Sequence, residues 1–96
     1  MDLILFLDVF KLHQNAAISG HNTISLENVS VDDCKLQCIK ADWCKSFDYH
    51  KNVNKCDLSN KNAAEVGGLK TNYVDNPFDY YERVPNDKGI KISLIL

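Results

Sequence analysis

Four cysteines between positions 34 and 56 constrain the fold of this 96-residue chain more than any other feature. They are Cys34, Cys38, Cys44 and Cys56, with the spacing C-x3-C-x5-C-x11-C. A chain of this length forms one domain with a small core, so covalent cross-links are expected to supplement burial. An even number of cysteines in so short a chain predicts two disulfides and a secreted or cell-surface protein.

The spacing limits how these cysteines can pair. Cys34 and Cys38 lie four apart on one face of a predicted helix, and a bridge between them would distort that helix. The nested pattern (Cys34 to Cys56, Cys38 to Cys44) and the crossed pattern both remain. We favour the nested pattern, because Cys38 is only a short turn from Cys44, while Cys34 can reach the following extended segment at Cys56.

A helix is predicted from Val31 to Ala41. Ser30 is a good N-cap, Asp33 stands in the position of a capping-box partner, and Val29 can pack onto the first turn. Acidic residues in that turn also suit the positive end of the helix dipole. The pattern predicts that Val31, Cys34, Cys38 and Ile39 are buried and that Lys35 and Gln37 face water.

Extended segments are predicted at 6–13, 44–49, 55–59 and 78–82. In the second of these, Phe47 and Tyr49 should face one side of a sheet and Ser46 and Asp48 the other. The chain should turn at 51–54, and residues 60–76 should form a loop. Residues 16–22 should form a connection or a second short extended piece, and the last strand should lie beside the first. The predicted fold class is α+β: one helix packed on a small antiparallel sheet and stapled to the central hairpin by two disulfides.

The net charge and the two chain ends argue against nucleic acid and membrane as partners. The chain has 11 basic and 13 acidic residues, a net charge of −2, and no basic block, which argues against a nucleic-acid binder. Met1–Asp8 lacks the positive region and cleavage site of a secretory leader, and Ile90–Leu96 is too short to span a bilayer. We therefore expect no membrane insertion by this chain and an export signal that belongs to a longer precursor.

Several motifs together resemble the PAN/apple domain family. They are SGHN at 19–22, VSVDDC at 29–34, WCKSFDY at 43–49, CDLS at 56–59, GGLKT at 67–71 and YYE at 80–82. The resemblance covers residues 10–83 and leaves an N-terminal strand or extension at 1–9 and a C-terminal extension at 84–96. Apple domains proper often add a bridge between their two ends, and no cysteine remains for it here, so the resemblance is to the simpler PAN form.

The resemblance implies a helix bridged to a central hairpin by two nested disulfides. It also implies a non-catalytic extracellular module, without a cofactor, that binds a protein or a carbohydrate as part of a larger adhesive, protease or receptor chain. A stand-alone secreted effector or inhibitor is one alternative. A neighbouring domain in the full gene would favour the module, and a signal peptide with this domain alone would favour the effector.

A small zinc module is the second alternative. Four cysteines with three histidines provide enough ligands, but zinc modules favour C-x2-C knuckles and this first pair is separated by three residues. A Cys–His nucleophile would need a free thiol, which paired cysteines cannot supply. Asp48 and Asp57 lie in predicted strands, where a partner on a neighbouring element explains a carboxylate better than acid–base catalysis does. We therefore expect neither a metal nor an enzyme.

The aromatic residues supply the candidate contacts. Trp43 and Phe47 are expected in the core. Tyr80 and Tyr81 are consecutive in a strand and must face opposite sides, so one of them should lie outside. The predicted ligand-binding residues, on the sheet face away from the helix, are Lys45, Tyr49, Asp79, Tyr80 and Tyr81. If these residues prove to be core, the site should be sought in the 60–76 loop.

One modification motif is present. Asn28-Val29-Ser30 matches the acceptor sequence for N-glycosylation. Ser30 is already explained as the helix cap, and the sequence leaves the modification of Asn28 open.

Overall fold

The capped segment after Ser30 forms the one α-helix in the part of the chain that the structure describes. The structure is a computed structural model and describes residues 10–84. Helix α1 spans Val31–Lys40. The Ser30 Oγ accepts a hydrogen bond from the Asp33 N–H at 3.1 Å, and Asp33 Oδ2 accepts one from the Ser30 N–H at 3.0 Å. The predicted cap and helix are therefore confirmed, with Ala41 as the C-cap.

Five strands form one antiparallel sheet in the order β1-β5-β3-β4-β2. The strands are β1 (Phe10–His13), β2 (Ile24–Glu27), β3 (Ser46–His50), β4 (Lys55–Ser59) and β5 (Phe78–Arg83). The hairpin β3–β4 is central, and β5 lies beside β1, as predicted. Strand β2 was not predicted, because only two apolar residues alternate in its four-residue span and most of it is exposed. Cys44 was expected inside a strand, but β3 begins only at Ser46.

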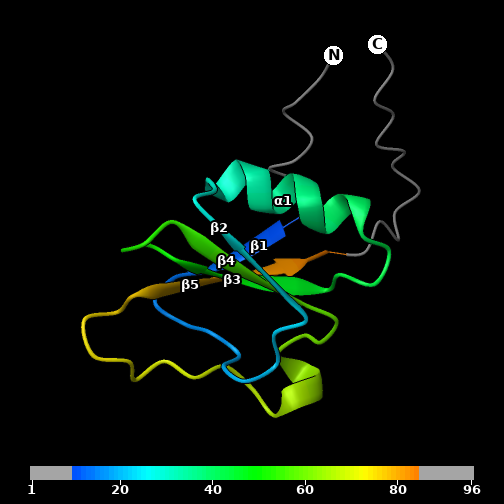
Figure 1. Cartoon of the computed structure of the whole chain (residues 1–96). Helices are drawn as coiled ribbons and strands as arrows, with labels where there is room; N and C mark the ends of the chain where they lie inside the picture. The colour runs from blue at the N-terminus through cyan, green and yellow to red at the C-terminus, as the bar shows by residue number, and fades with distance from the viewer. Residues whose placement is uncertain (1–9, 85–96) are drawn as a thin grey trace.

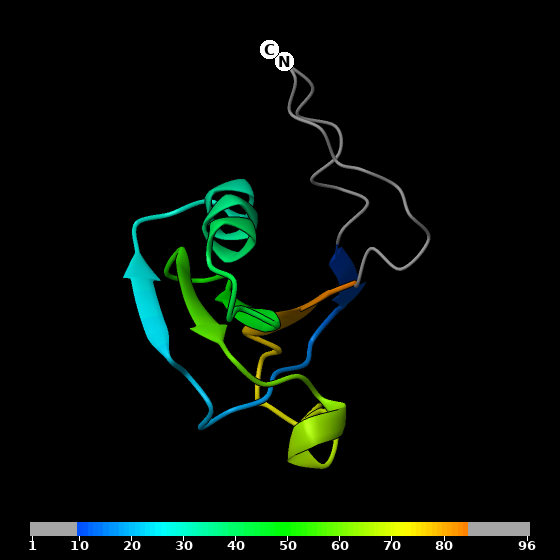
Figure 2. The same cartoon turned by 90° about the vertical axis from the view of Figure 1, so that its right-hand side faces the viewer.

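Both faces of the sheet are covered (Figures 1 and 2). Helix α1 packs on one face over a core of cysteines and of aromatic and aliphatic side chains: Phe10, Phe47, Tyr49, Leu58 and Tyr81. The opposite face carries residues 16–18 and the loop that contains the 3-10 helix η2 (Ala64–Val66), around a second cluster: Ala16, Ile18 and Tyr80, with Ala63, Val66 and Leu69 against it. The open second face assumed from the sequence is therefore wrong.

Two disulfides connect α1 to later segments of the chain. Cys34–Cys56 joins α1 to β4 with a Cα–Cα distance of 6.4 Å, and Cys38–Cys44 closes the turn after the helix at 5.2 Å. The nested pairing and the α+β fold class are confirmed. All four sulfurs are used in these bridges, so none is free to serve as the thiolate ligand that the zinc alternative requires.

The burial of two side chains differs from the prediction. Lys35, expected in water, is buried, and its ammonium lies 5.5 Å from the centroid of the Tyr81 ring. Trp43, expected in the core, is 37% exposed, whereas Phe47 is fully buried. The turn that bonds the Cys44 N–H to the Ala41 carbonyl directs Cys44 inward to its disulfide, and the neighbouring Trp43 outward.

Predictions for the chain ends lie outside the described residues: the strand at 6–9, the interpretation of Met1–Asp8 and that of Ile90–Leu96. Within residues 10–84, no helix has the length and apolar character needed to cross a membrane.

Candidate functional site

Tyr80 and Tyr81 are both buried, with relative exposures of 0% and 9%. They do face opposite sides of β5, but each side is covered. Tyr81 stacks on Phe47 beneath α1 with ring centroids 4.7 Å apart. On the other side, the Tyr80 hydroxyl accepts from the Ala63 N–H at 2.9 Å and donates to Glu82 Oε1 at 2.7 Å. The prediction that one of the two lies outside is wrong, and both are structural.

Tyr49 is also buried against α1. Its hydroxyl lies 2.8 Å from the Val29 carbonyl oxygen and 3.1 Å from Asn54 Oδ1, and donates its single proton to one of them at a time. This bond ties the segment that enters the helix to the end of the β3–β4 hairpin. Only the edge of Tyr49 is available to a ligand.

Lys45 is exposed, the Asp79 side chain is only 14% exposed, and the two lie far apart in the sheet. Lys45 precedes β3 and pairs with Glu65, Nζ to Oε2 at 2.8 Å. That contact lowers the pKa of the Glu65 carboxyl. Asp79 lies opposite Tyr49, near the other end of β3, and its Oδ1 is 3.0 Å from Lys51 Nζ. The five predicted contact residues therefore do not form one surface.

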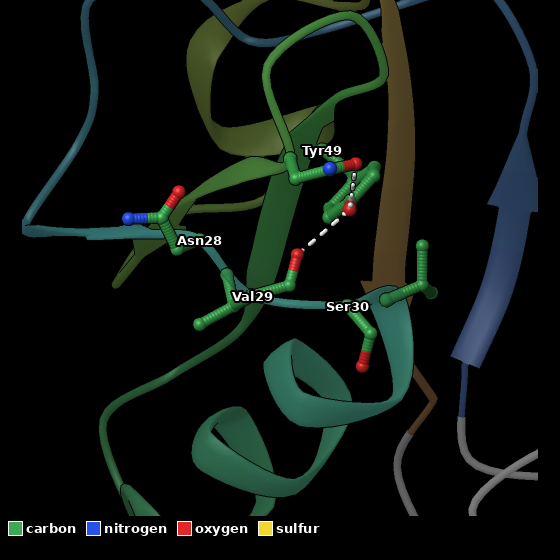
Figure 3. Close-up of a pocket in the computed structure, with 6 residues that line it drawn as sticks. Asn28, Val29, Ser30 and Tyr49 are labelled. Carbon is green, nitrogen blue, oxygen red and sulfur yellow. Dashed lines mark hydrogen bonds between the residues drawn. The ribbon is translucent and has the colours of Figure 1, made fainter.

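A shallow pocket of about 400 Å³ lies beside the N-terminus of α1 (Figure 3). Its lining comes from the entry to the helix and the end of the hairpin: Asn28, Val29, Ser30, Val31, Tyr49 and Asn54. The polar groups of Ser30 and Tyr49 already bond to other protein groups. The amide of Asn28 points away from Tyr49 in Figure 3.

A layer of polar side chains lies under the segments that cover the second face. Asp48 on β3 and Asp57 on β4 are directly opposite each other in the register. Both oxygens of Asp48 accept the Ile18 N–H, at 3.1 and 3.3 Å, and Asp57 Oδ1 accepts the Ser25 hydroxyl at 2.6 Å. Burial raises the pKa of Asp48 to about 7; the Ile18 N–H opposes this shift and the charge of Asp57 adds to it. Each carboxylate therefore has a structural partner on a neighbouring segment, as predicted.

A cluster of half-buried aromatic rings occupies one end of the second face. His50 of β3 lies opposite Phe78 of β5, with ring centroids 4.7 Å apart. Tyr73, from the loop before β5, meets the Phe78 ring edge-on at 4.9 Å. The Lys70 ammonium lies 4.7 Å from the Tyr73 centroid. We call His50, Tyr73, Phe78 and Lys70 the aromatic platform.

The Tyr73 hydroxyl distinguishes this platform from ordinary surface aromatics. Among the side chains of residues 10–84 it is the buried polar atom that has no hydrogen-bond partner. Buried polar groups are nearly always bonded, so this hydroxyl keeps an unused bonding capacity just beneath the surface of the platform. Sequence reasoning did not find this site. Tyr73 and Phe78 are aromatic, but nothing in their local sequence shows that they meet His50 and Lys70.

The fold and the site together define a small disulfide-stapled module with one helix on a five-stranded antiparallel sheet. The family model for the PAN domain matches residues 8–85. The chain therefore belongs to the PAN domain family. A search among curated proteins finds no match to it. PAN domains are generally non-catalytic modules.

Proposed function

We propose that this domain is a non-catalytic extracellular recognition module that binds a protein or glycan ligand through the aromatic platform. The observation that carries the proposal is the convergence of three half-buried rings and one lysine from separate segments of the chain, next to a hydroxyl with no partner. Protein recognition surfaces are enriched in aromatic side chains. Lys70 adds a positive charge that a carboxylate or a polar ligand group can meet.

Family membership and the two disulfides support an extracellular location, because structural disulfides form and persist in oxidising compartments. The platform also agrees with the second choice made from the sequence, a site in the 60–76 loop, because Lys70 and Tyr73 belong to that loop. Of the contacts predicted from the sequence, Asp79 follows Phe78 in β5, but it lies opposite Tyr49 and so faces the helix side of the sheet. Asp79 and Lys45, which lies at the other end of β3, are therefore proposed only as peripheral contacts.

Glycan-array and pull-down screens with the oxidised domain identify the ligand, and substitutions then locate its site. Tyr73→Ala should weaken binding at least about tenfold, as truncation of a central contact does. Lys70→Gln should weaken it less. The matched controls are Trp43→Ala, an exposed aromatic beside the end of α1, and Lys11→Gln on β1, and both should bind like the wild type. If Trp43→Ala abolishes binding while Tyr73→Ala does not, the platform is not the site.

Tyr73→Phe tests the orphaned hydroxyl itself. Removing a buried group without a partner should leave the free domain as stable as the wild type or more stable, because no hydrogen bond is lost. If the ligand supplies the missing bond, the same variant should bind more weakly. Unchanged affinity together with a raised melting temperature would mean that the hydroxyl has no role in recognition.

A further inference from the structure

Asn28 occupies an exposed corner at one edge of the sheet. It follows the last residue of β2, and β2 is an edge strand that pairs only with β4 among the described residues. Its φ of 58° lies in the left-handed region that asparagine tolerates better than most residues, and turns the chain from β2 toward α1. The side chain is exposed and directed away from Tyr49 (Figure 3). This amide therefore has open space in the folded protein.

We propose that Asn28 is an N-glycosylation acceptor and that its glycan covers the free edge of β2. Asn28, Val29 and Ser30 form the acceptor sequence. The two disulfides are typical of a chain that has passed through the secretory pathway, where this modification is made. The Asn28 side chain is exposed and its amide points away from Tyr49 (Figure 3), so the first sugar extends into solvent without displacing a neighbouring side chain.

The reaction uses an oligosaccharide carried on a lipid pyrophosphate as co-substrate. The Asn28 Nδ2 bonds to the anomeric carbon of the first sugar, the bond from that carbon to the phosphate oxygen breaks, and the lipid pyrophosphate leaves. The Nδ2 loses one proton, and no oxidation or reduction occurs. The product is an amide-linked glycan.

The fold constrains when this transfer happens. In the folded domain the Ser30 hydroxyl accepts the Asp33 N–H at 3.1 Å, and the Ser30 N–H is held by Asp33. The residue that completes the acceptor sequence is thus fixed as the helix cap, and Cys34 on the first turn is disulfide-bonded to Cys56. Transfer therefore precedes the formation of α1 and of this disulfide.

The position of the glycan gives it a physical role. An edge strand presents unpaired N–H and C=O groups that can pair with another chain, and proteins commonly cover or charge such edges. Ile24 on β2 is exposed, and Glu27 is the only charged residue of that strand. A glycan at the next residue shields this edge. The glycan is attached beside the N-terminus of α1, whereas the aromatic platform lies on the opposite face of the sheet, so the modification is compatible with the proposed binding site.

Secretion from a eukaryotic host tests the acceptor. Intact mass should show a glycan on the wild type and on Ser30→Thr, which keeps both the cap and the acceptor sequence. It should be absent from Asn28→Asp, which tolerates the same backbone conformation, and from Ser30→Ala. Enzymatic release should convert Asn28 to aspartate, a mass change that maps the site. A secreted, disulfide-bonded wild type without glycan at Asn28 overturns the assignment.

Light scattering tests the shielding role. The Asn28→Gly protein, which lacks the glycan, adds no charge and tolerates the positive φ, should self-associate at concentrations where the glycosylated wild type is monomeric. Adding Ile24→Lys should restore the monomer by charging the edge. An Asn28→Gly protein that stays monomeric overturns the shielding role. Ligand binding through the platform should be the same with and without the glycan, so this test is independent of the proposed function.

Discussion

Replacing Asp48 by asparagine should stabilise the domain at neutral and alkaline pH. Asp48 is 3% exposed and lies opposite Asp57, and the one described N–H that it accepts is that of Ile18. An asparagine keeps an oxygen for the Ile18 N–H and turns an amide donor, without charge, toward Asp57. The substitution therefore removes a buried charge and its repulsion while keeping the bond that holds residues 16–18 on the sheet.

The magnitude follows from the pKa of Asp48, which burial raises from 3.8 to about 7. A raised carboxyl pKa means that the folded state binds more protons than the unfolded state between these two values. Stability is then greatest below pH 4 and is lost as the pH rises through 7. By linkage, this group alone makes the wild type about 2–3 kcal/mol more stable at pH 5 than at pH 8. Asp48→Asn should remove that difference.

Urea melts of both proteins at pH 5, 6, 7 and 8 measure the effect. The informative quantity is the difference in stability between the variant and the wild type, in which the contributions of all other groups cancel. That difference should grow from pH 5 to pH 8. Asp42→Asn, on an exposed residue after α1, is the matched control and should leave the profile unchanged. Asp57→Asn removes the negative charge beside Asp48 and should therefore lower the pKa of Asp48. The loss of stability with rising pH should then occur at lower pH than in the wild type.

Two results would refute this reasoning. If the wild type and Asp48→Asn show the same pH dependence, Asp48 does not titrate near neutrality. If Asp48→Asn is less stable at pH 8, the carboxylate is needed as a charged acceptor for the Ile18 N–H, and its burial is favourable rather than costly.

Two further predictions concern how α1 is held. Replacing Cys34 and Cys56 by alanine should destabilise the domain by about 1 kcal/mol more than replacing Cys38 and Cys44, because the bridges span 22 and 6 residues and closure entropy grows with the logarithm of loop length; equal denaturant midpoints would point to packing instead. The Arg83 guanidinium donates to four carbonyl oxygens in and just after the last turn of α1, at 3.1 to 3.3 Å: those of Cys38, Ile39, Ala41 and Cys44. Arg83→Gln should therefore cost about 2 kcal/mol, with partial recovery in Arg83→Lys, and an unchanged urea midpoint would show that these bonds do not hold the helix end.

The local features of this domain could be predicted from the sequence because they depend on neighbours in the chain. The cap at Ser30 needs only Asp33, three residues later, and the β3–β4 hairpin depends on residues on either side of one turn. Helical spacing excluded a bridge between Cys34 and Cys38, and the short distance from Cys38 to Cys44 favoured the nested over the crossed pattern. The helix, its cap and the central hairpin were therefore determined by short-range geometry.

Which residues are exposed, and which are covered by other segments, was decided by the tertiary structure. Sequence alternation places Tyr80 and Tyr81 on opposite faces of β5, but it does not show that residues 16–18 and the η2 loop cover the second face. Those segments are held there by bonds between residues distant in the chain, such as the one from the Ile18 N–H to Asp48. The aromatic platform likewise requires β3, β5 and the loop between η2 and β5 to meet. Exposure depends on which distant segments cover a face, and no periodicity within one strand encodes that.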